Sequence, residues 1–70
     1  MLGKTIQSIR LSKGLTQSQL AIMTNCTDGL ICQIEKGQTE PSLKRLRKIA
    51  KALGVSISSL LENGEEKEIK

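Results

Sequence analysis

The chain has no histidine and no aromatic residue, and it contains only two cysteines and one proline. Without histidine, the imidazole base of a Ser-His-Asp triad and the commonest nitrogen ligand of zinc are both missing. Cys26 and Cys32 lack CxxC spacing and have no second pair of ligands, so they predict neither a metal shell nor a disulfide framework. We therefore expect no enzyme activity, no metal site and no cofactor.

Long apolar runs are absent as well. No run approaches the roughly 18 residues of a membrane span, and the amino terminus has no hydrophobic signal-peptide segment. We expect a cytoplasmic protein with no membrane partner and no small-molecule ligand. The 70 residues suffice for one small domain with an aliphatic core, which favours a helical bundle. We assign residues 1–64 to this domain and residues 65–70 to a charged flexible tail.

Acidic residues are scarce in most of the chain. Residues 1–61 carry nine Lys and Arg against three acidic residues, a net charge of +6, whereas residues 62–70 carry four Glu and two Lys, a net charge of −2. A basic body of this kind favours a polyanionic partner. The alternative is that the cations only solvate the outer faces of helices, and charge alone does not separate the two interpretations.

The apolar pattern predicts helices rather than strands, because apolar residues recur at intervals of three and four. Five helices are expected, over residues 2–13, 17–24, 28–36, 43–53 and 57–62. The apolar residues expected to form the inner faces of the second and fourth helices are Leu20, Ala21, Met23, Leu43, Leu46, Ile49, Ala50 and Leu53.

Capping residues support these boundaries. Thr16, with Gln19 three residues later, predicts a capping box, and Thr27, Ser42 and Ser56 offer hydroxyl N-caps. Glycine commonly ends a helix because it adopts the left-handed backbone without a Cβ clash. The glycines expected in this role are Gly14, Gly37, Gly54 and Gly64.

Residues 16–37, TQSQLAIMTNCTDGLICQIEKG, contain two short predicted helices joined by only three residues. Helices joined so tightly approach closely, so a small residue is needed near their crossing, and Ala21 occupies that place. Asn25 tolerates the left-handed backbone that the turn requires. Cys26, Ile31 and Ile34 are then expected to point inward. The segment therefore predicts a helix-turn-helix.

The segments IQSIRLSKGLTQSQLA and ICQIEKGQTEPSLKRLRKIAKALGVSISSLL resemble the phage-repressor and Cro-like helix-turn-helix family. The resemblance extends without a gap over residues 4–61. It implies an all-α, five-helix, lambda-repressor-like DNA-binding domain with a central helix-turn-helix. It also implies that the helix at 28–36 enters the major groove of double-stranded DNA and that a homodimer reads a near-palindromic operator. We expect a transcriptional regulator, and more specifically a repressor.

The resemblance also implies roles for individual residues. Gln17, at the start of the second helix, is expected to grip a DNA phosphate. The base-reading positions on the outer side of the third helix are Asp28, Gly29, Cys32 and Gln33. The other phosphate-binding positions are Thr27, Lys36, Gln38, Thr39, Ser42 and Lys44. Arg10 and Glu35 match a pair that forms an ion pair between the first and third helices, a structural role before a functional one.

Several positions depart from the family pattern. Gln33 offers the donor and acceptor that adenine requires and Asp28 an acceptor for the cytosine amino group, but no arginine lies on the outer side of the third helix. Asp28 is equally well explained as a helix-start residue. Thr24 occupies a position that is usually aliphatic, and we expect it to lower stability. These departures sustain a second hypothesis, an antitoxin-like or adaptor module that binds proteins and reads DNA weakly or not at all.

Overall fold

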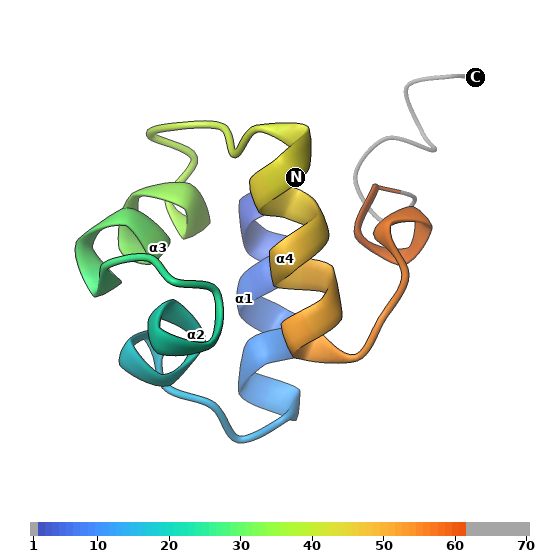
Figure 1. Cartoon of the computed structure of the whole chain (residues 1–70), viewed down its shortest axis with the longest axis horizontal. Coiled ribbons are helices and arrows are strands. Elements are labelled where there is room, and N and C mark those ends of the chain that lie inside the picture. Colours follow the sequence, from blue (N-terminus) through green and yellow to red (C-terminus); the bar gives the residue numbers. More distant parts are fainter. Residues whose placement is uncertain (1, 62–70) are drawn as a thin grey trace.

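The computed structural model describes residues 2–61, and all regular structure within that range is helical (Figure 1). The helices are α1 (Leu2–Ser12), α2 (Gln17–Met23), α3 (Asp28–Glu35) and α4 (Leu43–Leu53), and a fifth helical segment covers residues 57–61. The expected all-α, five-helix architecture is confirmed. The tail assigned to residues 65–70 lies outside the described residues.

Each helix from α2 onward begins at a hydroxyl cap. The side chain of Thr16 accepts a hydrogen bond from the Gln19 amide at 3.0 Å, and the Gln19 side chain accepts one from the Thr16 amide at 2.8 Å, which completes the capping box. Thr27 and Ser42 cap α3 and α4 through one hydrogen bond each, which their side chains accept from the amides of Leu30 and Arg45. Ser56 Oγ accepts from the Ser59 amide at 3.1 Å before the last helical segment. The predicted helix starts are therefore confirmed.

Left-handed backbone occurs where the chain turns sharply. Asn25, between α2 and α3, has φ 59°, a conformation that its short polar side chain tolerates. Gly54, which ends α4, has φ 74°, and Gly14 and Gly37 are also left-handed. These four positions were expected to terminate or turn the chain. The fourth glycine expected to end a helix, Gly64, lies outside the described residues.

The core is aliphatic, as the composition requires. Its buried residues come from every described helix: Ile6, Leu20, Ala21, Ile31, Ile34, Leu46, Ile49, Ala50, Leu53 and Leu60. Two residues expected to face the core are instead exposed, Met23 by 52% and Leu43 by 58%. Met23 is the last residue of α2 and Leu43 the first of α4. Each has the spacing of a core residue but lies at the end of its helix, beyond the part that packs against the core.

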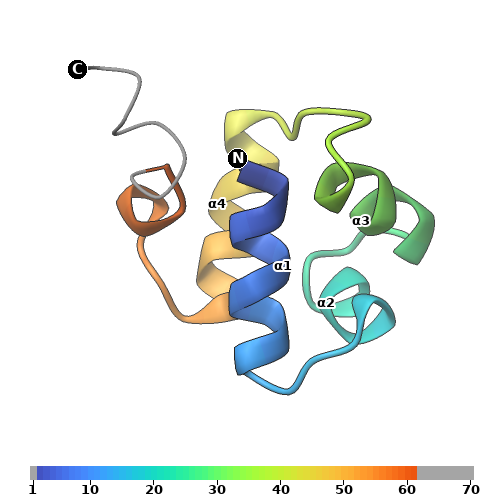
Figure 2. The same cartoon turned by 180° about the vertical axis from the view of Figure 1, so that it is seen from behind.

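The helices are arranged around the helix-turn-helix pair. In Figures 1 and 2, α2 and α3 lie on one side of α1 and α4, and residues 57–61 lie on the other side. α2 packs most extensively against α3, and Ala21 is buried. Its burial agrees with the small residue expected near the crossing of the two helices.

Gly3 has a packing role that the sequence pattern did not predict. A Cβ atom at this position would lie 2.4 Å from the carbonyl oxygen of Ile34 and 2.6 Å from that of Glu35. Both oxygens belong to backbone at the end of α3, which cannot move aside as a flexible side chain can. The missing side chain therefore lets α1 lie directly against the carboxyl end of α3.

We expect Gly3→Ala to destabilise the protein by about 1–3 kcal/mol, although alanine favours helix by about 1 kcal/mol over glycine. Gly29→Ala is the matched control, because a Cβ at that helical position has only Thr27 Oγ1 near it, at 3.9 Å. The control should raise stability by about 0.5–1 kcal/mol. Urea unfolding followed by far-ultraviolet circular dichroism measures both. Equal effects in the two variants would refute the close approach.

Candidate nucleic-acid interface

α3 presents one polar face outward and one apolar face to the core. Ile31 and Ile34 are buried, whereas Gln33 and Lys36 are exposed to solvent. Asp28 and Gly29 are also exposed, and Cys32 is half-buried. No part of the described chain covers the outer face of α3. Its side chains are therefore accessible to a large partner such as a nucleic acid duplex.

Asp28, the first residue of α3, is held by α2. The Ser18 hydroxyl donates a hydrogen bond to Asp28 Oδ2 at 2.9 Å, and both residues are exposed. This bond uses part of the acceptor capacity of the carboxylate and leaves the rest free. The contact of Ser18 with Asp28 was not predicted from the sequence, because nothing in the local pattern relates residues ten positions apart.

Cys26 is half-buried, less enclosed than the inward position expected for it. Arg45 Nη1 lies 2.6 Å from Cys26 Sγ as a donor, and Sγ in turn donates to the Thr24 carbonyl at 3.4 Å. The long Arg45 side chain therefore reaches from α4 to the turn between α2 and α3. Arg45 was not among the predicted site residues.

The residues expected along the DNA backbone surround the α3–α4 connection. The amide of Gln38 donates to the Gln33 carbonyl at 2.9 Å, which folds the chain back over the end of α3. Thr27 and Ser42 occupy N-caps, where their side chains accept from Leu30 N and Arg45 N. Lys36 caps the end of α3 and Lys44 lies in the first turn of α4, both exposed; Thr39 is half-buried.

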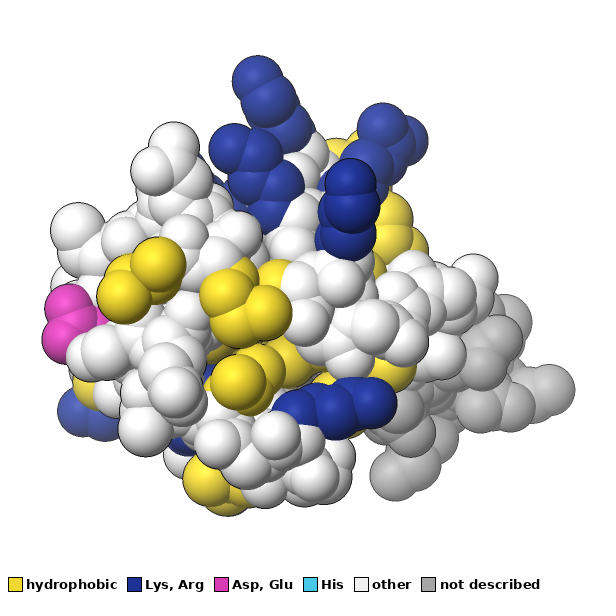
Figure 3. Space-filling view, turned by 60° about the horizontal axis from the view of Figure 1, so that its bottom comes forward, with side chains coloured by type: hydrophobic (Ala, Val, Ile, Leu, Met, Phe, Trp, Pro, Cys, Tyr) yellow, Lys and Arg dark blue, Asp and Glu magenta, His cyan; other side chains and the backbone are white. Residues whose placement is uncertain are grey.

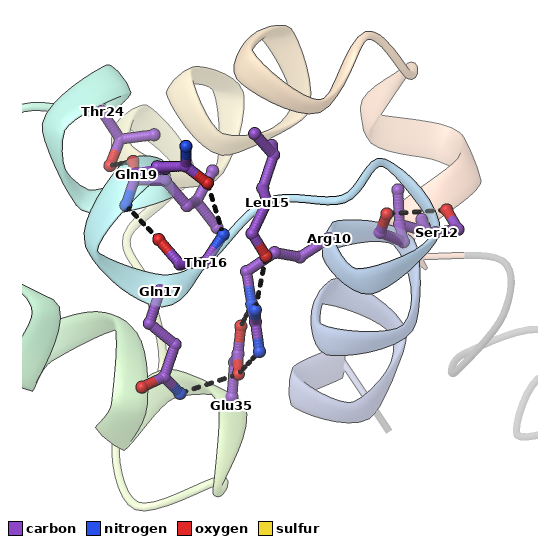
Figure 4. Close-up of polar contacts among 10 residues, drawn as sticks. Arg10, Ser12, Leu15, Thr16, Gln17, Gln19, Thr24 and Glu35 are labelled. Atoms are coloured by element: carbon purple, nitrogen blue, oxygen red, sulfur yellow. Dashed lines mark hydrogen bonds and ion pairs between the residues drawn. The ribbon is translucent and has the colours of Figure 1, made fainter.

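Arg10 and Glu35 form a buried ion pair between α1 and α3. Arg10 Nε donates to Glu35 Oε2 at 2.6 Å and Arg10 Nη2 donates to Oε1 at 3.1 Å, so the contact is bidentate (Figure 4). The side chains are only 7% and 1% exposed. Arg10 Nη1 also donates to the Leu15 carbonyl at 2.7 Å, which ties the loop before α2 to the same group.

Gln17 joins this network. Its Nε2 donates to Glu35 Oε1 at 3.0 Å, and in Figure 4 its amide oxygen points away from the carboxylate. An ionised carboxylate only accepts hydrogen bonds, so the amide nitrogen has to face Glu35. The residue expected to grip a phosphate is thus half-buried and already holds one partner.

Thr24 is 1% exposed, but its hydroxyl is not left without a partner. Oγ1 donates to the Leu20 carbonyl at 2.8 Å, one helical turn back. A satisfied hydroxyl removes most of the cost of burying a polar atom. The fold thus accommodates a hydroxyl at a position that is usually aliphatic in the family it resembles, and the expected loss of stability stays a prediction.

Exposed cations outnumber exposed acidic residues between residues 2 and 61. Figure 3 shows Lys and Arg side chains projecting from several parts of one face, whereas acidic side chains occupy a small area at its left edge. α4 contains no acidic residue, and Lys44, Arg47, Lys48 and Lys51 are all exposed on it. Between residues 2 and 61 there is no cluster of potential metal ligands and no helix long and apolar enough to cross a membrane.

Comparison with known proteins relates this geometry to one family. The sequence model of the helix-turn-helix family matches residues 6–60. An immunity repressor protein of Bacillus phage phi105 is 40% identical over 68 residues, which cover 97% of this chain. The HTH-type transcriptional regulator SinR of Bacillus subtilis is 35% identical over 69 residues, again covering 97% of the chain. The chain spans 46% and 62% of the lengths of these two relatives.

The fold is equally well matched. The crystal structure of the clp gene regulator ClgR from Corynebacterium glutamicum superimposes with a TM-score of 0.90 at 29% identity. The match covers 97% of this chain and 72% of that structure. The lambda-repressor-like arrangement expected from the sequence is therefore the arrangement that relatives of this chain adopt.

Removing one member of the buried ion pair should be costly, because the other charge is left without a partner inside the protein. We expect Arg10→Met or Glu35→Leu to lower the free energy of unfolding by about 3–5 kcal/mol. The double variant Arg10→Met/Glu35→Leu should lie within about 1 kcal/mol of the parent, because it leaves no buried charge. Thermal and urea unfolding measure all three, and additive losses in the double variant would contradict this account.

Proposed function

The chain belongs to the helix-turn-helix family, and from this premise we propose that it is a sequence-specific DNA-binding transcriptional regulator. The observation that carries the proposal is the solvent-exposed polar face of α3, held rigidly by an apolar face and a buried ion pair on its other side. An α-helix fits the major groove, where each base pair presents a distinct pattern of donors and acceptors. α3 is the helix that enters the groove.

Base reading rests on a small set of side chains. Gln33 is exposed in the last turn of α3 and its amide pairs with N6 and N7 of adenine. Asp28, oriented by Ser18, accepts from the amino group of cytosine. Gly29 lets the DNA approach the helix backbone closely, and Cys32 contributes a neutral contact beside Gln33.

The proposed phosphate-binding residues lie on either side of the reading face, which is the outer face of α3 formed by Asp28, Gly29, Cys32 and Gln33. Gln17 lies at the start of α2, and the remaining groups follow α3 or cap the helices around it. These contacts fix the register of the helix on the duplex without reading sequence. They comprise Gln17, Thr27, Lys36, Gln38, Thr39, Ser42 and Lys44.

We further propose that the protein acts as a repressor and binds as a homodimer, with half-sites about one helical turn apart. The immunity repressor relative supports the first point. For the second, the turn after α4 and the helical segment that follows it offer a contact, although Ile57, the first residue of that segment, is half-buried against the core rather than fully exposed. Because the partner is genomic DNA, the cytoplasm is the proposed place of action, and the role requires no catalysis.

A protein-binding module remains the second candidate. It is favoured by the hydrogen bond that engages Asp28 and by the absence of arginine from the outer face of α3. Such a module keeps the fold but reads DNA poorly. Selection from random DNA separates the two functions.

We expect selection of labelled duplexes from a random pool to recover a dyad-symmetric motif. Gln33→Ala should relax selection at one base pair of each half-site, by about 1–3 kcal/mol of discrimination, because it removes both the donor and the acceptor. Lys51→Ala, at the far end of α4, is the control and should recover the parental motif. An unenriched pool would favour the protein-binding module.

Salt dependence tests the phosphate contacts separately. With about four to six phosphates neutralised per subunit, log K should fall against log salt with a slope near −4 to −5 per subunit. Lys44→Gln should reduce the slope by about 0.9, since it removes one contact. Lys51→Gln removes the same charge seven residues further along α4 and should change the slope much less. Equal changes would show a diffuse charge effect rather than a contact at Lys44.

A further inference from the structure

Gln17, a proposed phosphate-binding residue, and Glu35, a member of the buried ion pair, are joined directly by a hydrogen bond. Glu35 is the last residue of α3 and Gln17 the first residue of α2, and the 3.0 Å hydrogen bond joins them across eighteen positions of sequence. Glu35 Oε1 accepts from Gln17 and Arg10 together, while Oε2 accepts from Arg10 alone. The carboxylate therefore serves two helices and not only its ion-pair partner.

This bond determines how Gln17 is presented. A glutamine amide nitrogen carries two protons, and one of those on Gln17 Nε2 is donated in the hydrogen bond to Glu35 Oε1. The second proton stays available, and the side chain cannot rotate freely while the first is held. A long polar side chain on an exposed helix start would otherwise lose rotamer entropy whenever it bound a ligand.

We infer that Glu35 is a positioning residue for phosphate binding: it holds one Nε2 proton of Gln17 so that the other is directed at a DNA phosphate. Arg10 contributes by fixing the carboxylate and, through the Leu15 carbonyl, the loop that leads into α2. The buried ion pair thus shapes DNA affinity as well as stability. The inference rests on the proposed DNA-binding function.

Two double variants isolate the acceptor from the charge. Arg10→Met/Glu35→Gln and Arg10→Met/Glu35→Leu both remove the ion pair, but only the first keeps a carbonyl oxygen at residue 35 that can accept from Gln17. Their affinities are compared, for the duplex recovered by selection, at equal folded fraction measured by circular dichroism. Because both variants lack Arg10, both should bind more weakly than the parent, but the glutamine variant should bind about tenfold more tightly than the leucine variant.

Gln17→Ala completes the cycle. Added to the leucine variant, Gln17→Ala should cause no further loss of DNA affinity, because Gln17 is no longer held by residue 35 in that variant. Added to the glutamine variant, it should lower affinity about tenfold. Equal affinities of the glutamine and leucine variants, or losses that multiply when Gln17→Ala joins the leucine variant, would overturn the positioning role.

A measurement on the unaltered protein covers the case in which a variant fails to fold. By NMR, one Gln17 side-chain proton should exchange slowly with solvent in the free protein, and both should do so in the complex with the selected duplex. Two fast-exchanging protons in the free protein would overturn the inference. If the parent binds no duplex DNA at all, the proposed function fails. If the parent binds DNA but the glutamine and leucine variants have the same affinity, only the positioning role of Glu35 is refuted.

Discussion

The buried pair between Arg10 and Glu35 is the constraint that fixes how α1, α2 and α3 meet. It joins the first helix to the last residue of α3, and Gln17 and the Leu15 carbonyl attach α2 and its preceding loop to the same two side chains. Buried charges are tolerated only when paired and hydrogen-bonded, so removing Arg10 or Glu35 alone would leave a buried charge without its partner. The aliphatic core supplies most of the stability, but hydrophobic contacts are not directional. The bidentate ion pair is directional, and it constrains how α1, α2 and α3 are oriented relative to one another.

Gly3 works together with this pair. It lies seven residues before Arg10, on the same side of α1, and its missing side chain allows α1 to rest against the carbonyl oxygens at the end of α3. The close approach brings Arg10 within reach of Glu35 and keeps water away from both. A small chain without aromatic residues thereby fixes α3 against α1 through a close backbone approach and an ion pair.

Charged side chains are paired in the interior but not on the outer surface of α4. The two buried charges of the described chain, Arg10 and Glu35, are paired with each other, whereas the exposed cations on α4 have no acidic neighbour on that helix. Asp28 lies between the two cases: it is exposed and bound by Ser18, on a reading face that carries no arginine. In the proposed complex, phosphate contacts would supply most of the affinity, and Gln33 and Asp28 most of the discrimination between sequences.

The sequence by itself determined the helices, their caps and the helix-turn-helix. These depend on residues three or four positions apart, as with Thr16 and Gln19, or on one backbone conformation, as at Asn25. The pairing of Arg10 with Glu35 was available only through family resemblance. Tertiary structure alone decided the contacts of Gly3, Ser18, Gln17 and Arg45, and the exposure of Met23 and Leu43 at helix ends. These features depend on how helices distant in sequence are placed in space, which periodicity and capping do not specify.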